Sequence, residues 1–218
     1  MSPPHDHLAA LRSTCDDLGI LLPGEEAQKA ISLHLEELYR WNERINLTGI
    51  RSPEEGTRRH AAESLVALPF VQRAAAAAPA DRPAPLLADL GSGNGFPGLP
   101  LLLAVTETRG VLVESAGRKA DFLRSVVRRT GCHDRVSVLE SRLESEGQLP
   151  EPPDVFTLRA FPEPDRWITA LARGGRWVLA WLARKDAERI ARHPEVATRA
   201  VVEPLPTHRD STLLVITP

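Results

Sequence analysis

The sequence predicts an α/β fold: a mostly parallel, seven-stranded sheet with helices on both faces, an antiparallel pair of strands at one edge, and a helical cap at the N-terminus. After Leu86, short apolar runs alternate with helical segments, a pattern typical of parallel sheets. Residues 199–218 hold two strand-like runs with no helix between them, so these two are expected to pair antiparallel. Before residue 74, apolar side chains recur at helical spacing instead.

The cap, residues 1–73, is expected to hold three helices. The first stops at Gly19, and the second carries apolar side chains on one face as far as Ile45. The third is expected to begin after the N-cap Ser52, with Pro53 at its first position and a glutamate three residues after the cap, as in a capping box. It is expected to run to the end of the cap.

An Ala- and Pro-rich connector, residues 74–85, separates the cap from the α/β domain, residues 86–218. The five parallel strands are expected, in chain order, at residues 86–90, 110–114, 135–139, 154–158 and 176–181. Helices are expected to begin near Gly98, Gly117, Pro162 and Lys185.

Composition limits the class of protein. The chain has 218 residues, 42% of them apolar, and a net charge of −2, which fits a globular protein with a substantial core. No stretch approaches the roughly 20 apolar residues of a membrane helix, and the N-terminal residues lack the pattern of a signal peptide. Cys15 and Cys132 are isolated, which predicts neither a disulfide framework nor a metal site. We therefore expect a cytoplasmic protein.

Positive charge is concentrated in two zones. Residues 117–135 hold six Lys or Arg against two Asp, and residues 40–60 hold five Arg against three Glu. On a chain that is nearly neutral overall, two such zones predict a confined phosphate-binding face. Solvated helix faces that are rich in Arg remain the alternative.

A glycine-rich turn follows the first strand, in "LLADLGSGNGFPGLPLLLA". Turns at this place in a parallel sheet contact ligands, because glycine lets the backbone N–H groups approach them closely. A P-loop is excluded, since no Lys follows the glycines. Gly93, Gly95 and Gly98 match the dinucleotide pattern G-x-G-x-x-G, which is weak on its own.

Pro97 favours a different interpretation. Proline is well accepted in the first turn of a helix, so a helix that opens at Pro97 leaves Gly91, Gly93 and Gly95 in the turn, with Asp89 before them. This is D-x-G-x-G-x-G, the first motif of class I methyltransferases that use S-adenosylmethionine. Asp89 is then expected to accept from the ammonium of the cofactor, directly or through water.

Glu114 ends the second strand, where an acidic residue typically accepts both ribose hydroxyls of an adenosine ligand. Nicotinamide enzymes use the same device, so Glu114 predicts an adenosine ligand without choosing the cofactor. A surface acid at a strand end is the alternative.

Several longer segments resemble one family. "WNERINLTGIRSPEE", "RRHAAESL", "DLGSGNGFPGLPL", "ESAGRKADFLR", "SRLE" and "LRAF" occur in that order, from about Trp41 to the C-terminus. They are similar to the glucose-inhibited division protein B family, the small-subunit ribosomal RNA guanine-N7 methyltransferases (RsmG). The resemblance implies a Rossmann-like class I methyltransferase fold.

The resemblance also implies a cofactor, contacts and a substrate. The implied S-adenosylmethionine contacts are Gly91, Phe96, Leu143, Glu144 and Arg159, and Arg159 is also the candidate for positioning the reactants. The implied substrate is a guanine in the 530 loop of 16S rRNA, free or in the small subunit. Guanine N7 carries an unprotonated lone pair, so no catalytic base is expected, and no metal is expected either.

The RNA must be held by charge and shape, with the target base turned out of its stack. The RNA-binding candidates are Arg58, Arg59, His60, Arg118, Lys119, Arg124 and Arg128. For His60, a structural role in packing is the alternative.

Two features depart from the family pattern. Glu63 and Glu114 stand where the family usually has Asp, and Trp181 stands where the family commonly has Lys at the end of the fifth strand. A non-catalytic RNA-binding or ribosome-assembly factor and a nicotinamide-dependent oxidoreductase are the alternative functions. The protein is expected to be a monomer.

Overall fold

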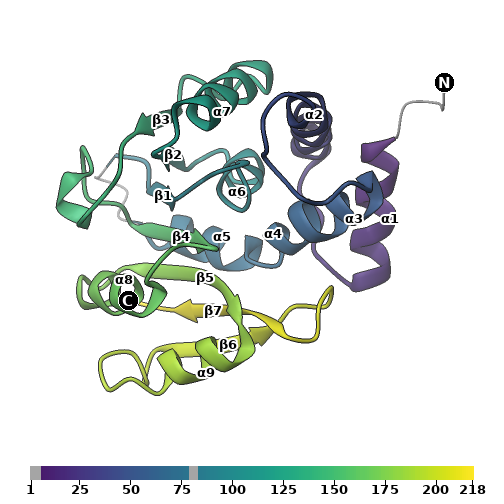
Figure 1. The fold of residues 1–218 in the computed structure, drawn as a ribbon. Coiled ribbons are helices and arrows are strands. Elements are labelled where there is room, and N and C mark those ends of the chain that lie inside the picture. Colours follow the sequence, from purple (N-terminus) through teal and green to yellow (C-terminus); the bar gives the residue numbers. More distant parts are fainter. Residues whose placement is uncertain (1–5, 79–82) are drawn as a thin grey trace.

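The computed structural model describes residues 6–78 and 83–218. A seven-stranded sheet lies at its centre (Figure 1). In chain order its strands are β1 (Leu86–Leu90), β2 (Arg109–Glu114), β3 (Val136–Glu140), β4 (Val155–Arg159), β5 (Trp177–Ala183), β6 (Ala200–Pro204) and β7 (Ser211–Ile216). Across the sheet the order is β3-β2-β1-β4-β5-β7-β6.

The strand pairing confirms the fold class. Strands β1 to β5 pair in parallel, whereas β7 runs antiparallel to both of its neighbours, β5 and β6. In this register Asp89 on β1 lies opposite Thr157 on β4 and Leu112 on β2. The carboxyl ends of β1, β2, β3 and β4 therefore meet at one edge, where ligands bind in sheets of this kind.

Helices cover both faces of the sheet. In chain order the helices of the described residues are α1 (His7–Leu18), α2 (Glu25–Asn42), α3 (Pro53–Gly56), η1 (Thr57–Ala62), α4 (Glu63–Leu65), α5 (Leu68–Ala76), α6 (Gly98–Ala104), α7 (Gly117–Arg129), η2 (Glu146–Gln148), α8 (Pro164–Arg173) and α9 (Arg184–Ala191). Helices α6 and α7 pack against β1, β2 and β3, while α8 and α9 pack at the β5–β7–β6 side. Helix α2 packs on α6 and α7, and α1 packs on α2, which gives the cap its outer position (Figure 1).

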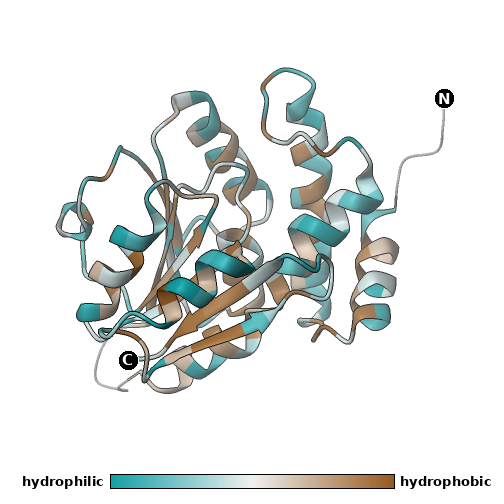
Figure 2. Cartoon of the chain, turned by 60° about the horizontal axis from the view of Figure 1, so that its bottom comes forward, coloured by the Kyte–Doolittle hydropathy of each residue, from teal (hydrophilic) through white to brown (hydrophobic). Residues whose placement is uncertain are grey.

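Two apolar clusters form the core, one on each face of the sheet. Along β1 the side chains alternate, so that Leu87 joins the cluster with α2, α6 and α7, whereas Leu86 and Leu90 join the cluster with α8 and α9. Figure 2 shows the hydrophobic strands between helices whose outer turns are more hydrophilic. Of the described residues, none belongs to a helix long and apolar enough to span a membrane.

The first cap helix and the start of the third follow the prediction. Helix α1 is followed by Gly19 in the left-handed conformation (φ +63°), and the Ser52 side chain accepts a hydrogen bond from Glu55 N at the start of α3. The prediction of one continuous third helix is wrong. The chain passes through the π-helix η1, leaves the helix after Leu65 and re-enters it as α5, because Pro69 has no N–H to continue the α-helical ladder.

The division into residues 1–73, 74–85 and 86–218 stays a prediction, and residues 1–5 and 79–82 lie outside the described residues. Helix α5 extends into the predicted connector. Side chains of the cap share one apolar cluster with α6 and α7, for example Leu11 with Phe122. The cap therefore contributes to the same core as one face of the sheet.

Candidate functional site

The turn after β1 needs glycine at three positions. Gly91, Gly93 and Gly95 have φ values of +70°, +51° and +85°, in the left-handed region where a Cβ causes strain. The turn ends at Pro97, and α6 begins at Gly98. This is the helix start that separated the methyltransferase motif from the dinucleotide pattern in the sequence.

Aromatic rings close in on the turn from both sides. A Cβ built on Gly91 would lie 2.7 Å from the Phe161 ring, which comes from the loop between β4 and α8. A Cβ on Gly95 would lie 2.8 Å from the His34 ring, which comes from α2. The Nε2–H of His34 donates to the carbonyl of Asn94 at 2.8 Å. The turn is thus held between the sheet domain and the cap.

Glu114 ties the turn to the end of β2. Its two carboxylate oxygens accept hydrogen bonds from the backbone N–H groups of Gly93, at 2.9 Å, and Ala116, at 2.8 Å. The side chain is buried. The carboxylate therefore lies at the predicted strand end, next to the turn, and each oxygen keeps a lone pair for a further donor such as a ribose hydroxyl.

Asp89 lies beneath the turn rather than on the surface. It is 1% exposed, its Oδ1 accepts from the hydroxyl of Thr157 at 2.6 Å, and its Oδ2 faces the backbone of Gly98 at the start of α6. Burial raises the pKa of Asp89 to about 6, although hydrogen bonds from Thr157, Ser92 and the Gly98 backbone act in the opposite direction. The carboxylate therefore ties the turn to β4 and to the first residue of α6.

A cleft of about 500 Å³ opens beside the turn, at the carboxyl ends of β1 to β4. Three of the predicted cofactor contacts line it: Gly91, Leu143 and Glu144. Phe161 and Trp167 line the same cleft, with their rings edge to face at 5.4 Å between centroids. Its volume falls in the usual range for small-molecule sites.

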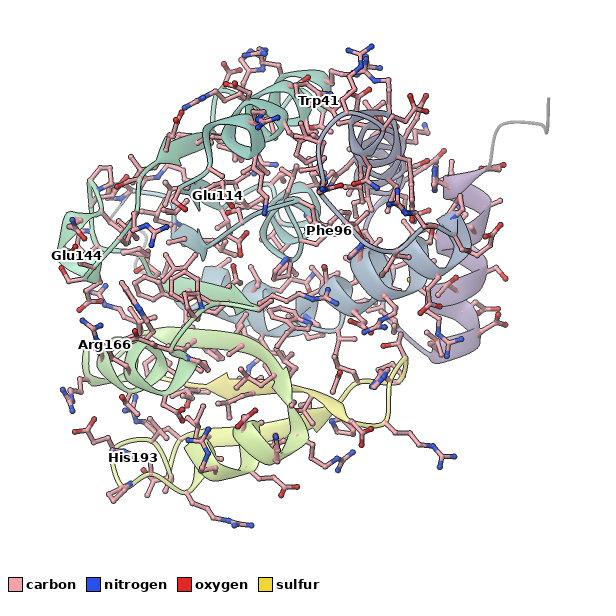
Figure 3. The ribbon with its side chains drawn as sticks, viewed as in Figure 1. Trp41, Phe96, Glu114, Glu144, Arg166 and His193 are labelled. Atoms are coloured by element: carbon pink, nitrogen blue, oxygen red, sulfur yellow. The ribbon has the colours of Figure 1, made fainter. Side chains whose placement is uncertain are left out.

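The aromatic wall of this cleft was not among the features predicted from the sequence. Phe161, Arg166 and Trp167 all follow β4, and Figure 3 shows Glu144 and Arg166 at the same side of the molecule. The signal that was available is the Phe-Pro pair right after the fourth strand, since loops at the carboxyl ends of parallel strands build ligand sites. Ala160 and Glu163, on either side of that pair, have positive φ values of 51° and 50°, which side chains rarely adopt.

Phe96 lies away from this cleft, on the side of the turn that faces the cap (Figure 3). Its ring stacks on His34 at 4.0 Å and on His60 at 5.2 Å between centroids. Burial lowers the pKa of His34 to about 4 and that of His60 to about 3. His60 also shares a hydrogen bond with the Thr48 hydroxyl at 2.9 Å, and most of its ring is buried in the cap.

Arg159 ends β4 and pairs with a buried carboxylate of the cap. Its Nη2 donates to Glu63 Oε2 at 2.6 Å, while its Nη1 is buried without a partner. Burial lowers the pKa of Arg159. Trp181 lies beside it on β5, and its indole N–H donates to the Glu63 carbonyl at 3.0 Å. Trp181 is therefore a core residue, not an exposed aromatic.

The two basic zones of the sequence meet between α2 and α7. Arg40, Arg44 and Arg118 line a groove of about 260 Å³ together with Asp121 and Trp41. Figure 3 labels Trp41 at this place. Among the other RNA-binding candidates, Arg58 and Arg128 are exposed, and Lys119 and Arg59 are half-buried. Arg124 is less free than the sequence suggests, because it forms ion pairs with Asp121 and Glu140, both at 2.9 Å. Within residues 6–78 and 83–218, no three His, Cys, Asp or Glu side chains form a group that could hold a metal ion.

A family model and two curated relatives that match this chain by sequence carry the same description. A family model described as GidB, rRNA small subunit methyltransferase G, matches residues 27–210. The chain is 35% identical over 190 residues to ribosomal RNA small subunit methyltransferase G of Alkalilimnicola ehrlichii, covering 86% of this chain and 80% of that protein. It is 34% identical over 203 residues to the Myxococcus xanthus protein of the same name, covering 90% and 87%.

Solved structures show the same fold at low identity. The METTL16 MTase domain matches with a TM-score of 0.54 and 14% identity, over 99% of this chain and 92% of that one. The C-terminal domain of precorrin-6Y C5,15-methyltransferase from Rhodobacter capsulatus matches with a TM-score of 0.51 and 17% identity, over 78% and 92%. These likenesses concern the fold alone.

Proposed function

Because the chain belongs to the ribosomal RNA small subunit methyltransferase G family, we propose that it methylates N7 of a guanine in the 530 loop of 16S rRNA, with S-adenosylmethionine as the methyl donor. The observation that carries this proposal is the family match over residues 27–210, which includes the glycine turn and the cleft beside it. The chain is an rRNA small subunit methyltransferase on a Rossmann-like fold.

The residues present fit the proposed cofactor. Three left-handed glycines keep the turn free of side chains, a cleft of about 500 Å³ adjoins it, and the Glu114 carboxylate lies next to the turn. The proposed contacts are the nine predicted from the sequence: Asp89, Gly91, Gly93, Gly95, Phe96, Glu114, Leu143, Glu144 and Arg159. Of these, Gly91, Leu143 and Glu144 line the cleft, whereas Phe96 packs on the cap side of the turn. Phe161 and Trp167 are added as an aromatic wall. Bound there, the cofactor would supply an electrophilic methyl group on a sulfonium.

The chemistry asks little of the side chains beyond binding and orientation. Guanine N7 holds its lone pair in the ring plane and is not protonated at neutral pH, so no residue has to remove a proton. The protein then accelerates the reaction by aligning the two reactants and excluding water. Asp89 on β1 and Arg159 on β4 are proposed to orient the cofactor, Asp89 from below the turn and Arg159 from the carboxyl end of β4.

The basic surface supports an RNA partner. Arg118 from α7 and Arg44 from the segment after α2 line one groove, and Arg58 and Arg128 add exposed charge. Guanidinium groups bind phosphate in pairs of hydrogen bonds, and the neighbouring Trp41 offers a face for stacking. We propose that 16S rRNA or the small subunit binds here, that the protein acts in the cytoplasm, and that it acts as a monomer.

A transfer assay tests the proposal. The protein is incubated with S-adenosylmethionine labelled in its methyl group and with naked 16S rRNA, small subunits or large-subunit rRNA. Label is expected in 16S rRNA or small subunits and not in large-subunit rRNA. Cofactor and RNA binding without any transfer would instead support a non-catalytic RNA-binding factor, and binding of NADH in place of S-adenosylmethionine would support an oxidoreductase.

A further inference from the structure

One buried polar cluster joins the cap to the catalytic edge of the sheet. Its centre is Glu63, which is 1% exposed and lies at the start of α4. Its Oε2 accepts from Arg159 at 2.6 Å, its Oε1 accepts from the hydroxyl of Thr207 in the β6–β7 loop, and its backbone carbonyl accepts from Trp181. Three segments distant in sequence thus bond to this one residue, two of them to its carboxylate.

Two guanidinium groups lie at the Glu63 carboxylate, those of Arg159 and Arg59. Arg59 Nε lies 3.9 Å from Glu63 Oε1 and equally far from Glu55 Oε1, so Arg59 is divided between two acids. Arg59 Nε and Arg159 Nη1 are both buried without a hydrogen-bond partner. A buried charged donor left unpaired is destabilising, and an acceptor on a ligand would offset that cost. The cluster therefore has an unused cationic donor, and Arg159 keeps 21% of its side chain exposed.

The unused donor lies on the same face of the sheet as a buried acid. Asp89 pairs with Thr157, and Arg159 follows Thr157 by two residues, so both side chains project from one face. Asp89 lies below the glycine turn, and Arg159 lies one step nearer the carboxyl edge. The Asp89 carboxylate faces the backbone of Gly98, whereas Arg159 Nη1 is a cationic donor without a partner. A guanidinium donor at this place complements a carboxylate, such as the one at the methionine end of the proposed cofactor.

We propose that Glu63 is a positioning residue: together with Thr207 it holds the Arg159 guanidinium by one amino group, so that the other, Nη1, donates to the carboxylate at the methionine end of the cofactor. Trp181 anchors the backbone of Glu63 in this arrangement. The inference rests on the proposed function, since it takes S-adenosylmethionine as the ligand. It gives the cap, through Glu63, a direct effect on cofactor affinity.

Calorimetric titration with two ligands tests this role. S-adenosylhomocysteine has the amino-acid end of the cofactor, whereas 5′-methylthioadenosine has the adenosine but no carboxylate or ammonium. In Glu63→Gln we expect the Kd for S-adenosylhomocysteine to rise about tenfold or more, as a charged hydrogen bond of about 1.5–3 kcal/mol is weakened, with the Kd for 5′-methylthioadenosine unchanged. Glu63→Asp, which keeps the charge, should restore most of the affinity.

A matched control is available in Glu37. This carboxylate is also 1% exposed and pairs with two arginines, Arg40 and Arg129, but these partners belong to α2 and α7 and not to β4 or the glycine turn. Glu37→Gln is expected to leave both Kd values unchanged. Should Glu63→Gln fail to fold, Thr207→Val removes a single hydroxyl and is expected to raise the Kd for S-adenosylhomocysteine about threefold, with no effect on the other ligand.

Three results would overturn the inference: an equal loss of both ligands in Glu63→Gln, no loss of either, or Glu63→Asp behaving like Glu63→Gln. Failure of the proposed function looks different, because wild-type protein would then bind neither nucleoside.

Discussion

Two buried histidines make the stability of this protein sensitive to acid. His34 and His60 are 0% and 8% exposed, and burial lowers the pKa of His34 to about 4 and of His60 to about 3, against about 6.5 in an unfolded chain. Both are therefore neutral in the folded state at pH 5, while the unfolded chain takes up protons below pH 6.5. The free energy of unfolding is therefore highest above pH 6.5 and falls as the pH drops toward the folded-state pKa values, because only the unfolded chain takes up these protons.

The size of the effect follows from these pKa values. Between pH 7 and pH 5 each histidine lowers the free energy of unfolding by about 2 kcal/mol, since one unit of pKa difference corresponds to about 1.4 kcal/mol. Asp89 acts in the opposite direction. Its pKa is raised to about 6, so the folded state takes up its proton first, which adds about 1 kcal/mol of stability at pH 5. We expect a net loss of about 2–3 kcal/mol.

Urea unfolding at pH 7, 6 and 5 measures this change. In the double variant His34→Gln, His60→Gln the loss should disappear, because glutamine does not titrate and can still donate to the Asn94 carbonyl. His193→Gln is the control, since this histidine is exposed on the loop after α9 (Figure 3). If wild-type protein is equally stable at pH 5 and pH 7, or if the double variant loses as much stability as the wild type, these two histidines are not the cause of the acid sensitivity.

Three further changes have defined outcomes. Gly93→Asp should abolish cofactor binding and methyl transfer, because φ is +51° and the new carboxylate would face Glu114, 3.9 Å from the built Cβ; a normal titration with S-adenosylhomocysteine would contradict this. Phe161→Leu should raise the Kd for 5′-methylthioadenosine about two- to tenfold, the loss of an aromatic contact of about 0.5–1.5 kcal/mol, and an unchanged Kd would remove this ring from the site. Arg118→Glu with Arg128→Glu should weaken RNA binding and reduce the slope of log K against log salt by about 2, and a slope like that of the wild type would place the RNA elsewhere.

The sequence carried enough information to place the sheet and the turn. Each parallel strand is a short apolar run between breaks, and Leu86–Leu90 forms over the predicted residues. The antiparallel edge was predictable because too few residues separate the last two runs for a helical crossover. The helix start after Pro97 followed from the chemistry of proline alone. Such features depend on neighbours in the chain, which a single sequence displays.

Contacts between distant segments were beyond the sequence. His34 gave no sign that its ring would meet Asn94 and Phe96, because sixty residues separate it from the turn. The break in the third cap helix was visible as Pro69, yet the π-helix before it depends on tertiary packing. Glu63 was noted only as a departure from the family pattern, and its place under Arg159 depends on the cap docking against β4.

Mass mapping of the modified nucleosides in 16S rRNA tests the proposed methyl transfer at its product, because it identifies the methylated atom and its place in the RNA. Unmodified 16S rRNA is incubated with S-adenosylmethionine and either wild-type protein or Gly93→Asp, then digested and compared fragment by fragment. We expect a single 7-methylguanosine, in the fragment that holds the 530 loop, with wild-type protein only. A methyl group on another atom or in another fragment, or no methyl group at all, would contradict the account.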